Sequence, residues 1–170
     1  MAWCGQAIAE AQGSPLRCDR AWRRPGDAVR RGMPGHRLTL DPDVAEIPRL
    51  LDWLEERCGK AGFGSDFSFR LALALDEAVA NVIRHAFTGQ KPPHRLAVEL
   101  DTGGDIVTAT IIDNGKAFDP TAAPAPDVSL PLEQRDPGGL GIHLIRRMVD
   151  RVEYRRAGGE NRLRLEKSRG

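Results

Sequence analysis

Hydrophobic side chains recur with helical spacing along two stretches, and a shorter alternating segment precedes them. Leu38 and Leu40 alternate with polar neighbours, which predicts a short strand. A helix is predicted to open at Asp41-Pro42, because aspartate caps helices and proline fits their first turn, and to end within residues 59–64. Its apolar stripe consists of Ile47, Leu50, Leu51 and Leu54.

A second helix is predicted over residues 66–87, because apolar residues again repeat every three or four positions. Its stripe consists of Leu71, Leu75, Ala78 and Val82. Further along the chain, residues 95–100 and 106–112 have the pattern of two strands joined by a glycine-containing turn. The remaining predicted elements are a helix at about 140–149 and strands near 152–156 and 162–166.

These elements define an α+β protein. We expect a two-layer α/β sandwich, in which a mixed, mostly antiparallel sheet carries its helices on one face. Residues 114–137 contain five prolines and little periodicity, which predicts a long loop of the functional or mobile kind. Residues 1–35 mix Gly, Pro and Arg without a period, so we expect a flexible, arginine-rich tail ahead of one domain at residues 36–170.

The composition agrees with one folded domain and limits the classes of partner that the domain is expected to bind. Of the 170 residues, 41% are hydrophobic and 29% are charged, which suits a core under a solvated surface. The net charge of +1 gives no general attraction to nucleic acid. No apolar run approaches the roughly 20 residues of a membrane helix, and three widely spaced cysteines form neither a disulfide framework nor a metal motif. We therefore expect a cytoplasmic protein with no direct contact to nucleic acid or membrane.

Two polar residues stand beside the apolar stripe of the second helix. Glu77 and Asn81 are four residues apart, so they lie one turn apart on one face. Burying them is costly without partners, and a magnesium nucleotide would supply partners. The Asn81 carbonyl can ligate Mg²⁺, and Glu77 can accept a proton from an attacking hydroxyl. For this pair alone, a solvated helix face is the ordinary alternative.

Asp113 ends a predicted strand and is followed by Asn114-Gly115. Such a sequence is common in turns, but it also suits a purine pocket. An ionised aspartate only accepts hydrogen bonds, so it pairs with the exocyclic amine of adenine and disfavours guanine, which has a carbonyl there. Gly115 would let the ring approach the backbone closely.

A glycine cluster, Gly138-Gly139-Leu140-Gly141, runs directly into a predicted helix. Glycines at a helix start expose backbone N–H groups and the positive end of the helix dipole, which bind phosphate. For the cluster alone, a flexible turn is the alternative.

The order of these features is more specific than any one of them, and it resembles the three sequence boxes of the GHKL superfamily of Bergerat-fold ATP-binding proteins. The N-box corresponds to Glu77-Ala-Val-Ala-Asn81, the G1 box to Asp113-Asn-Gly-Lys-Ala-Phe-Asp-Pro120 and the G2 box to Gly138-Gly-Leu-Gly-Ile142. Ala117 replaces the second glycine of the G1 box. The short form is most similar to the anti-sigma-factor serine kinases, and the resemblance covers residues 36–167.

This resemblance implies a role for each motif residue. Asn81 would hold Mg²⁺ between the phosphates of ATP, and Glu77 would activate a serine hydroxyl. Asp113 would bind the adenine amine, with Gly115 beneath the ring. The phosphate loop would comprise Gly138, Gly139, Leu140 and Gly141, and residues 116–137 would form a lid over the nucleotide.

The function that the resemblance implies is ATP-dependent phosphorylation of a serine on a STAS-domain (anti-anti-sigma) partner, with sequestration of a sigma factor as a second activity. It also implies a homodimer, with the first strand and first helix as its faces. Two alternatives stay open. One is a non-catalytic module, in which ATP sets a conformation that grips a partner. The other is a kinase module detached from a larger signalling system.

A truncated chain that begins at Met33 tests the proposed domain boundary. We expect it to fold and to bind nucleotide as the full chain does, because the residues removed show no core-forming period. Circular dichroism and calorimetric titration with ADP would measure both properties. Loss of folding on this truncation would place the boundary further toward the N-terminus.

Overall fold

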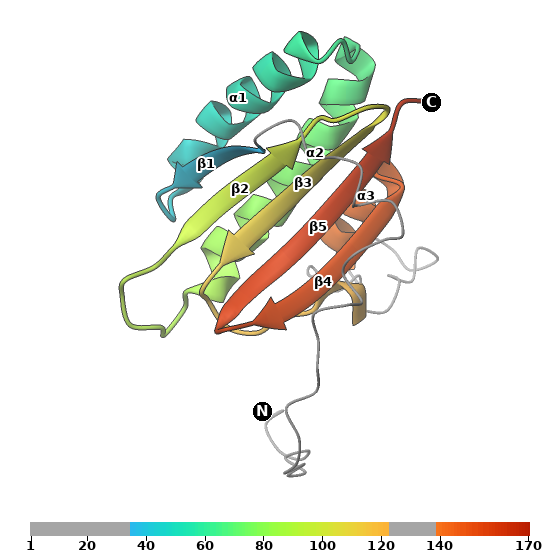
Figure 1. Ribbon diagram of the computed structural model, residues 1–170. Coiled ribbons are helices and arrows are strands. Elements are labelled where there is room, and N and C mark those ends of the chain that lie inside the picture. The colour runs from blue at the N-terminus through green and yellow to red at the C-terminus, as the bar shows by residue number, and fades with distance from the viewer. Residues whose placement is uncertain (1–34, 123–138) are drawn as a thin grey trace. The chain divides into compact units, whose positions relative to one another are not determined.

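The computed structural model describes residues 35–122 and 139–170. Within them, five strands form one sheet with the order β1-β2-β3-β5-β4 (Figure 1). The strands are β1 (His36–Leu40), β2 (Leu96–Asp101), β3 (Ile106–Asp113), β4 (Arg151–Ala157) and β5 (Glu160–Ser168). Every pairing between these described strands is antiparallel, so their sheet is simpler than the mixed sheet that the sequence suggests.

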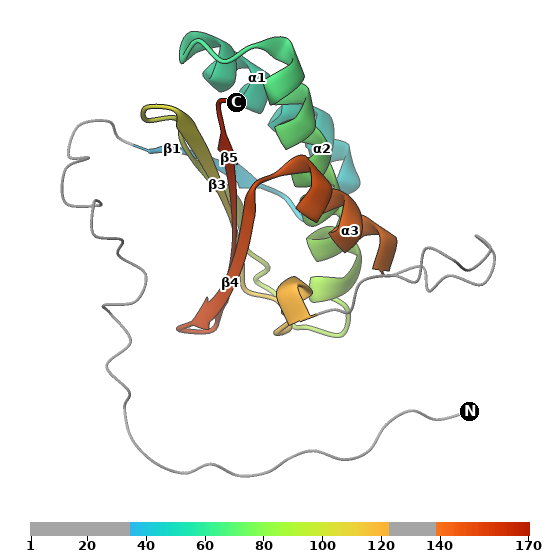
Figure 2. The same ribbon diagram turned by 90° about the vertical axis from the view of Figure 1, so that its right-hand side faces the viewer.

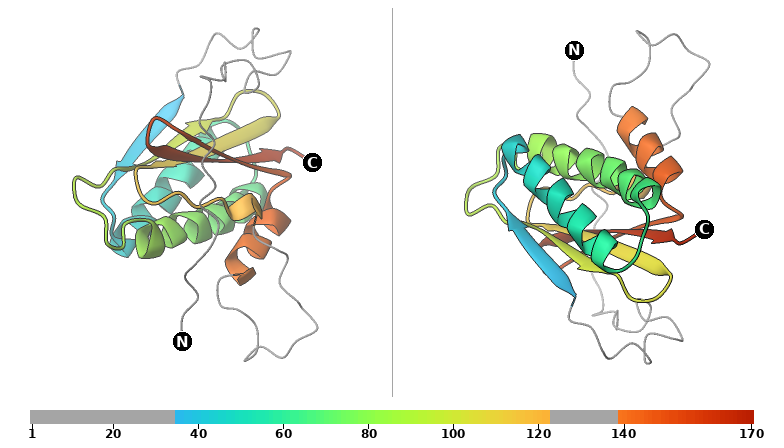
Figure 3. Two further views of the ribbon diagram at one scale, coloured as in Figure 1. Left: turned by 90° about the horizontal axis from the view of Figure 1, so that it is seen from below. Right: turned by 90° about the horizontal axis from the view of Figure 1, so that it is seen from above.

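All helices of the described domain lie on one face of the sheet, as Figure 2 shows with the sheet on edge. They are α1 (Ile47–Lys60), α2 (Ser65–Asn81) and α3 (Gly139–Met148), with the short turns η1 (Val44–Glu46), η2 (Val82–Ala86) and η3 (Pro120–Ala122). Helix α2 packs against both α1 and α3, and Figure 3 shows it between them. The predicted two-layer α+β sandwich is therefore confirmed.

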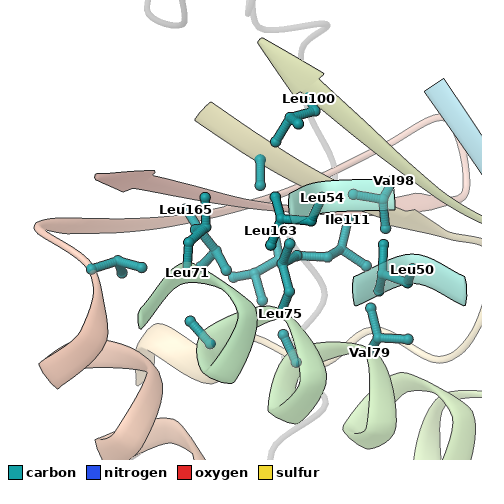
Figure 4. Packing of buried hydrophobic residues seen from close by; sticks show 14 of the residues in the cluster. Leu50, Leu54, Leu71, Leu75, Val79, Val98, Leu100, Ile111, Leu163 and Leu165 are labelled. Atoms are coloured by element: carbon teal, nitrogen blue, oxygen red, sulfur yellow. The ribbon is translucent and has the colours of Figure 1, made fainter. Parts of the chain in front are cut away.

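An apolar core joins the two layers (Figure 4). Its fully buried side chains include Leu50 and Leu54 from α1, Leu71, Leu75 and Val79 from α2, and Val98, Leu100, Ile111 and Leu165 from the sheet. Burying one side chain of this size stabilises a fold by about 1.5–3 kcal/mol. The predicted stripes include Leu50, Leu54, Leu71 and Leu75 but not Val79, and their members Ile47, Leu51 and Val82 are only partly buried. Periodicity therefore identifies most of each buried face.

The start of α1 differs from the prediction. The helix begins at Ile47 instead of at Asp41-Pro42, and Pro48 occupies its first turn. Asp43 caps the preceding turn η1, because its side chain accepts a hydrogen bond from the N–H of Ala45. A proline ring clashes with an α-helical turn on its N-terminal side, which explains why the α-helix starts only here.

Helix α2 agrees with its predicted start but changes character near its end. Beyond Asn81 the chain continues as the π-helical turn η2, which ends at Ala86. Such wider turns occur frequently at functional sites. None of the helices in the described ranges is long and apolar enough to cross a membrane. Residues 1–34 of the predicted tail and residues 123–137 of the predicted lid lie outside the described residues.

Candidate active site

A cavity of about 380 Å³ lies between the sheet and the helices α2 and α3. Its apolar walls include Ala78, Val82, Ile142, Ile145 and Leu163. Its polar lining residues are Asn81, His85, Asp113, Lys116, Tyr154 and Asn161. A mostly apolar cavity of this size with a few polar groups is typical of a site for a small organic ligand.

Asp113 lies at the end of β3, lines the cavity and is only 5% exposed. Its Oδ1 accepts hydrogen bonds from the N–H of Gly115 and from Asn161 Nδ2, both at 2.8 Å. Oδ2 accepts none from the residues that the structure describes, so it is free for a ligand donor. Burial raises the pKa of this carboxyl, and the donors from Asn161 and Gly115 and the charge of Arg156 oppose that rise.

Gly115 is required by a close approach between backbone segments. A Cβ atom built on it would lie 2.6 Å from both the Cβ and the carbonyl oxygen of Ala86. The N–H of Lys116 donates to that same oxygen at 2.9 Å, so the loop after β3 rests on the end of η2. Gly115 is not among the described residues that line the cavity, and its predicted contact with a base stays a prediction.

Glu77 and Asn81 lie one turn apart on α2, as predicted. Asn81 Nδ2 donates to Glu77 Oε1 at 3.2 Å, which leaves the Asn81 carbonyl oxygen without a partner among the described residues. Asn81 lines the cavity, whereas Glu77 is not among its described lining residues. The amide is therefore oriented with its oxygen available as a ligand.

The carboxylate of Glu77 also touches the start of α3. A Cβ atom on Gly141 would lie 2.0 Å from Glu77 Oε1, so this position must be glycine while the carboxylate holds its place. Gly139, Leu140 and Gly141 form the first turn of α3, whereas Gly138 lies outside the described residues. The structure thus brings Glu77, the predicted general base, to the helix start that is predicted to bind phosphate.

Asn161 is a site residue that the sequence analysis missed. It pairs directly with Asp113 across β3 and β5, and Arg156 pairs with it from β4. Asn161 is only 5% exposed. A usable signal existed, since alternation along this strand places residue 161 on the same face as the buried Leu163 and Leu165. A polar residue at an inward strand position indicates a partner inside.

The residues at the cavity also fit a magnesium ion held by a nucleotide. No group of three or more His, Cys, Asp or Glu side chains that could hold a metal occurs in the described ranges. Mg²⁺ is usually bound by one or two protein oxygens together with phosphate oxygens and water. The unpartnered carbonyl oxygen of Asn81 provides one such ligand, so the donor set suits a nucleotide-bound ion.

An antiparallel sheet with helices on one face, and a ligand-sized cavity between the layers, is the architecture of a GHKL-type nucleotide-binding domain. A model of the family described as "Histidine kinase-like ATPase domain" matches residues 40–167. The chain belongs to this family.

Two curated relatives carry kinase names. Serine/threonine-protein kinase BtrW of Bordetella bronchiseptica is 37% identical over 131 residues, or 75% of this chain and 89% of that protein. Serine-protein kinase RsbW of Listeria monocytogenes is 30% identical over 120 residues, or 68% of this chain and 74% of that protein. The solved RsbU and RsbW domains of Rv1364c from Mycobacterium tuberculosis match 80% of this chain and 32% of that chain, with a TM-score of 0.53 and 18% identity. That structure shares the fold.

In the absence of nucleotide, replacing Asp113 with asparagine should stabilise the folded protein. The amide oxygen of the new side chain can accept both hydrogen bonds that Oδ1 accepts now, and the cost of burying a charge disappears. The raised pKa of Asp113 means that this cost is present at neutral pH and absent below about pH 4, where the carboxyl is protonated in both the folded and unfolded states. A gain of about 1 kcal/mol would raise Tm by roughly 2–4 °C.

Thermal melts of Asp113→Asn and of the wild type across pH 4–8 would measure this difference. It should be largest at neutral pH and fade toward pH 4, and ADP affinity should fall in the same variant. Asp52→Asn, on an exposed part of α1, is the matched control and should leave Tm unchanged. A lower Tm for Asp113→Asn at pH 7 would contradict the interpretation.

Proposed function

We propose that this protein is an ATP-dependent serine-protein kinase of the anti-sigma-factor type, which phosphorylates a STAS-domain partner. The observation that carries the proposal is the arrangement around one cavity. A buried carboxylate with a free oxygen, Asp113, lies at the end of the sheet. The hydrogen-bonded pair of Glu77 and Asn81 lies beside the start of α3. The kinase names of the relatives support the same function.

In the proposed complex, the base of the nucleotide lies at Asp113 and its phosphates lie at the start of α3. Asp113 Oδ2 accepts a hydrogen bond from the adenine amine, and the apolar walls pack against the ring. The first turn of α3 directs backbone N–H groups and its positive dipole toward the phosphates. Asn81 would hold Mg²⁺ together with the phosphate oxygens, and the ion would supply positive charge near the transferring group.

Phosphoryl transfer then needs one group that takes a proton. The serine Oγ of the partner forms a bond to the γ-phosphorus, while the bond from that phosphorus to the β–γ bridging oxygen breaks and ADP leaves. The proton of the serine hydroxyl moves to the Glu77 carboxylate. Asn81 holds this carboxylate through its amide N–H, so one helix face orients both the base and the metal ligand.

A non-catalytic binding module is the second candidate. One observation favours it: Glu77 is engaged by Asn81 and packs against Gly141, and it is not among the described lining residues of the cavity. In this alternative, Glu77 only braces the start of α3, and ATP sets a conformation that binds a partner.

The homodimer that the family resemblance suggests would use β1, which lies at one edge of the described sheet.

Nucleotide selectivity tests the adenine assignment. We expect calorimetry to give magnesium-dependent binding of ATP and ADP, with GTP weaker by roughly tenfold or more. The reason is that the guanine carbonyl would face the Asp113 carboxylate and leave it without a donor. Equal affinity for ATP and GTP would remove the assignment of Asp113 to the base.

Substitutions on α2 separate the kinase from the binding module. Asn81→Ala should impair binding of magnesium ATP itself, because it removes a metal ligand. Glu77→Gln should keep ATP affinity nearly unchanged and slow transfer to a STAS serine by about 10²–10⁴-fold, the usual contribution of a general base. ATP affinity and the transfer rate at saturating ATP would be measured for each variant.

The matched control is Asp76→Asn, which neutralises the neighbouring carboxylate and should leave both quantities unchanged. Wild-type transfer rates in Glu77→Gln would show that Glu77 is not the base. If the wild type binds STAS proteins encoded beside it in an ATP-dependent way but transfers no phosphate to them, the binding module replaces the kinase.

A further inference from the structure

Asn161 uses all of its hydrogen-bonding capacity inside the domain. Its Nδ2 donates to Asp113 Oδ1 and to the carbonyl oxygen of Lys116, both at 2.8 Å. Its Oδ1 accepts from the hydroxyl of Tyr154 at 2.8 Å and from Arg156 Nη1. A side-chain amide has two N–H donors and two acceptor positions, so this buried amide is fully satisfied.

This pattern allows only one orientation of the amide. A reversed amide would turn its oxygen toward the Asp113 carboxylate and the Lys116 carbonyl, and would turn its N–H groups toward the Arg156 guanidinium. The Tyr154 hydroxyl could adapt by accepting. The contacts with Asp113, Lys116 and Arg156, however, would each pair acceptor with acceptor or donor with donor inside the protein, which costs free energy. Asn161 is therefore a rigid donor aimed at one oxygen of Asp113.

The orientation of Asp113 follows from that of Asn161. Oδ1 is held by two donors, the amide of Asn161 and the N–H of Gly115. This fixes the plane of the carboxylate and leaves Oδ2 as the oxygen without a partner among the described residues. A ligand amine that enters the cavity then meets an acceptor whose position is already set, so binding loses less entropy in ordering that side chain.

The same residues also hold the loop that follows β3. Arg156 Nη1 donates to the carbonyl oxygen of Gly115 at 3.0 Å, and Asn161 Nδ2 donates to the carbonyl oxygen of Lys116. From the other side, Ala86 accepts from the N–H of Lys116. The loop is thus fastened both to the hairpin of β4 and β5 and to the end of η2.

We propose that Asn161 is the positioning residue that sets the base selectivity of this site, by holding Asp113 so that Oδ2 is presented to the 6-amino group of an adenine nucleotide. The inference rests on the proposed nucleotide site and deepens it. A leucine at this position would continue the buried row of β5 at lower polar cost, but it would leave the carboxylate of Asp113 without its side-chain donor. The amide thus serves the ligand contact in addition to the fold.

The test compares two nucleotides that differ only at the proposed contact. ADP carries the 6-amino group, and purine riboside diphosphate lacks it. The wild type should prefer ADP, and Asn161→Ala should weaken ADP by roughly tenfold while changing the affinity for the analogue much less. The ratio of the two affinities should therefore fall toward one. A purely structural role would weaken both nucleotides equally.

Two further variants complete the design. Arg162→Gln changes the next residue of β5, which is on the opposite face of the strand, and should leave the ratio unchanged. Tyr154→Phe keeps the ring and removes one hydrogen bond to Asn161, so the ratio should fall by less than in Asn161→Ala. If Asn161→Ala does not fold, as judged by circular dichroism, the ratio in Tyr154→Phe decides.

Each outcome has a distinct meaning. A wild type that binds neither nucleotide overturns the proposed nucleotide site itself. A wild type that prefers ADP, with the same preference in Asn161→Ala, overturns only the role of Asn161, as does an equal loss for both nucleotides. A ratio that collapses in Asn161→Ala and stays constant in Arg162→Gln supports the inference.

Discussion

The packing of α2 against the sheet is the contact on which the site depends. Leu71, Leu75 and Val79 lie fully buried between the layers, and they set the height and rotation of the helix above the strands. Glu77 and Asn81 are carried on the adjoining face of the same helix. Because cores are close-packed and transmit small shifts, a change in this apolar contact would move the polar pair relative to Asp113, which is held by the sheet.

Burying Asp113 is the main electrostatic cost at the cavity. Desolvation favours the neutral form of a carboxyl, whereas a ligand amine needs an acceptor. The surrounding strands offset the cost with donors from Asn161 and from the backbone of Gly115, and with the positive charge of Arg156. The arrangement lowers the stability of the ligand-free fold but orients an acceptor before a ligand binds, as is common in sites with preorganised polar groups.

Helical periodicity carried most of the information that could be obtained from the sequence. The stripe that includes Leu71 and Leu75 predicts the buried face of α2, and the spacing of Glu77 and Asn81 predicts their contact without any tertiary knowledge. The pairing of Asp113 with Asn161 could not be predicted in that way, because the two residues are 48 positions apart and meet only through the register of β3 and β5. Local patterns predict neighbours on one element, whereas register between strands is a property of the whole sheet.

The two glycines that touch α2 and its π-helical extension η2 have a packing role that the sequence does not reveal. Gly115 lies against Ala86, and Gly141 lies against the carboxylate of Glu77. Neither has the positive φ that favours glycine, so close contact explains both. From sequence, each suggests flexibility or a nearby ligand. In the structure, each lets a loop or helix start approach this helical segment closely. A side chain at position 115 would clash with the backbone of Ala86, and one at position 141 would displace the Glu77 carboxylate.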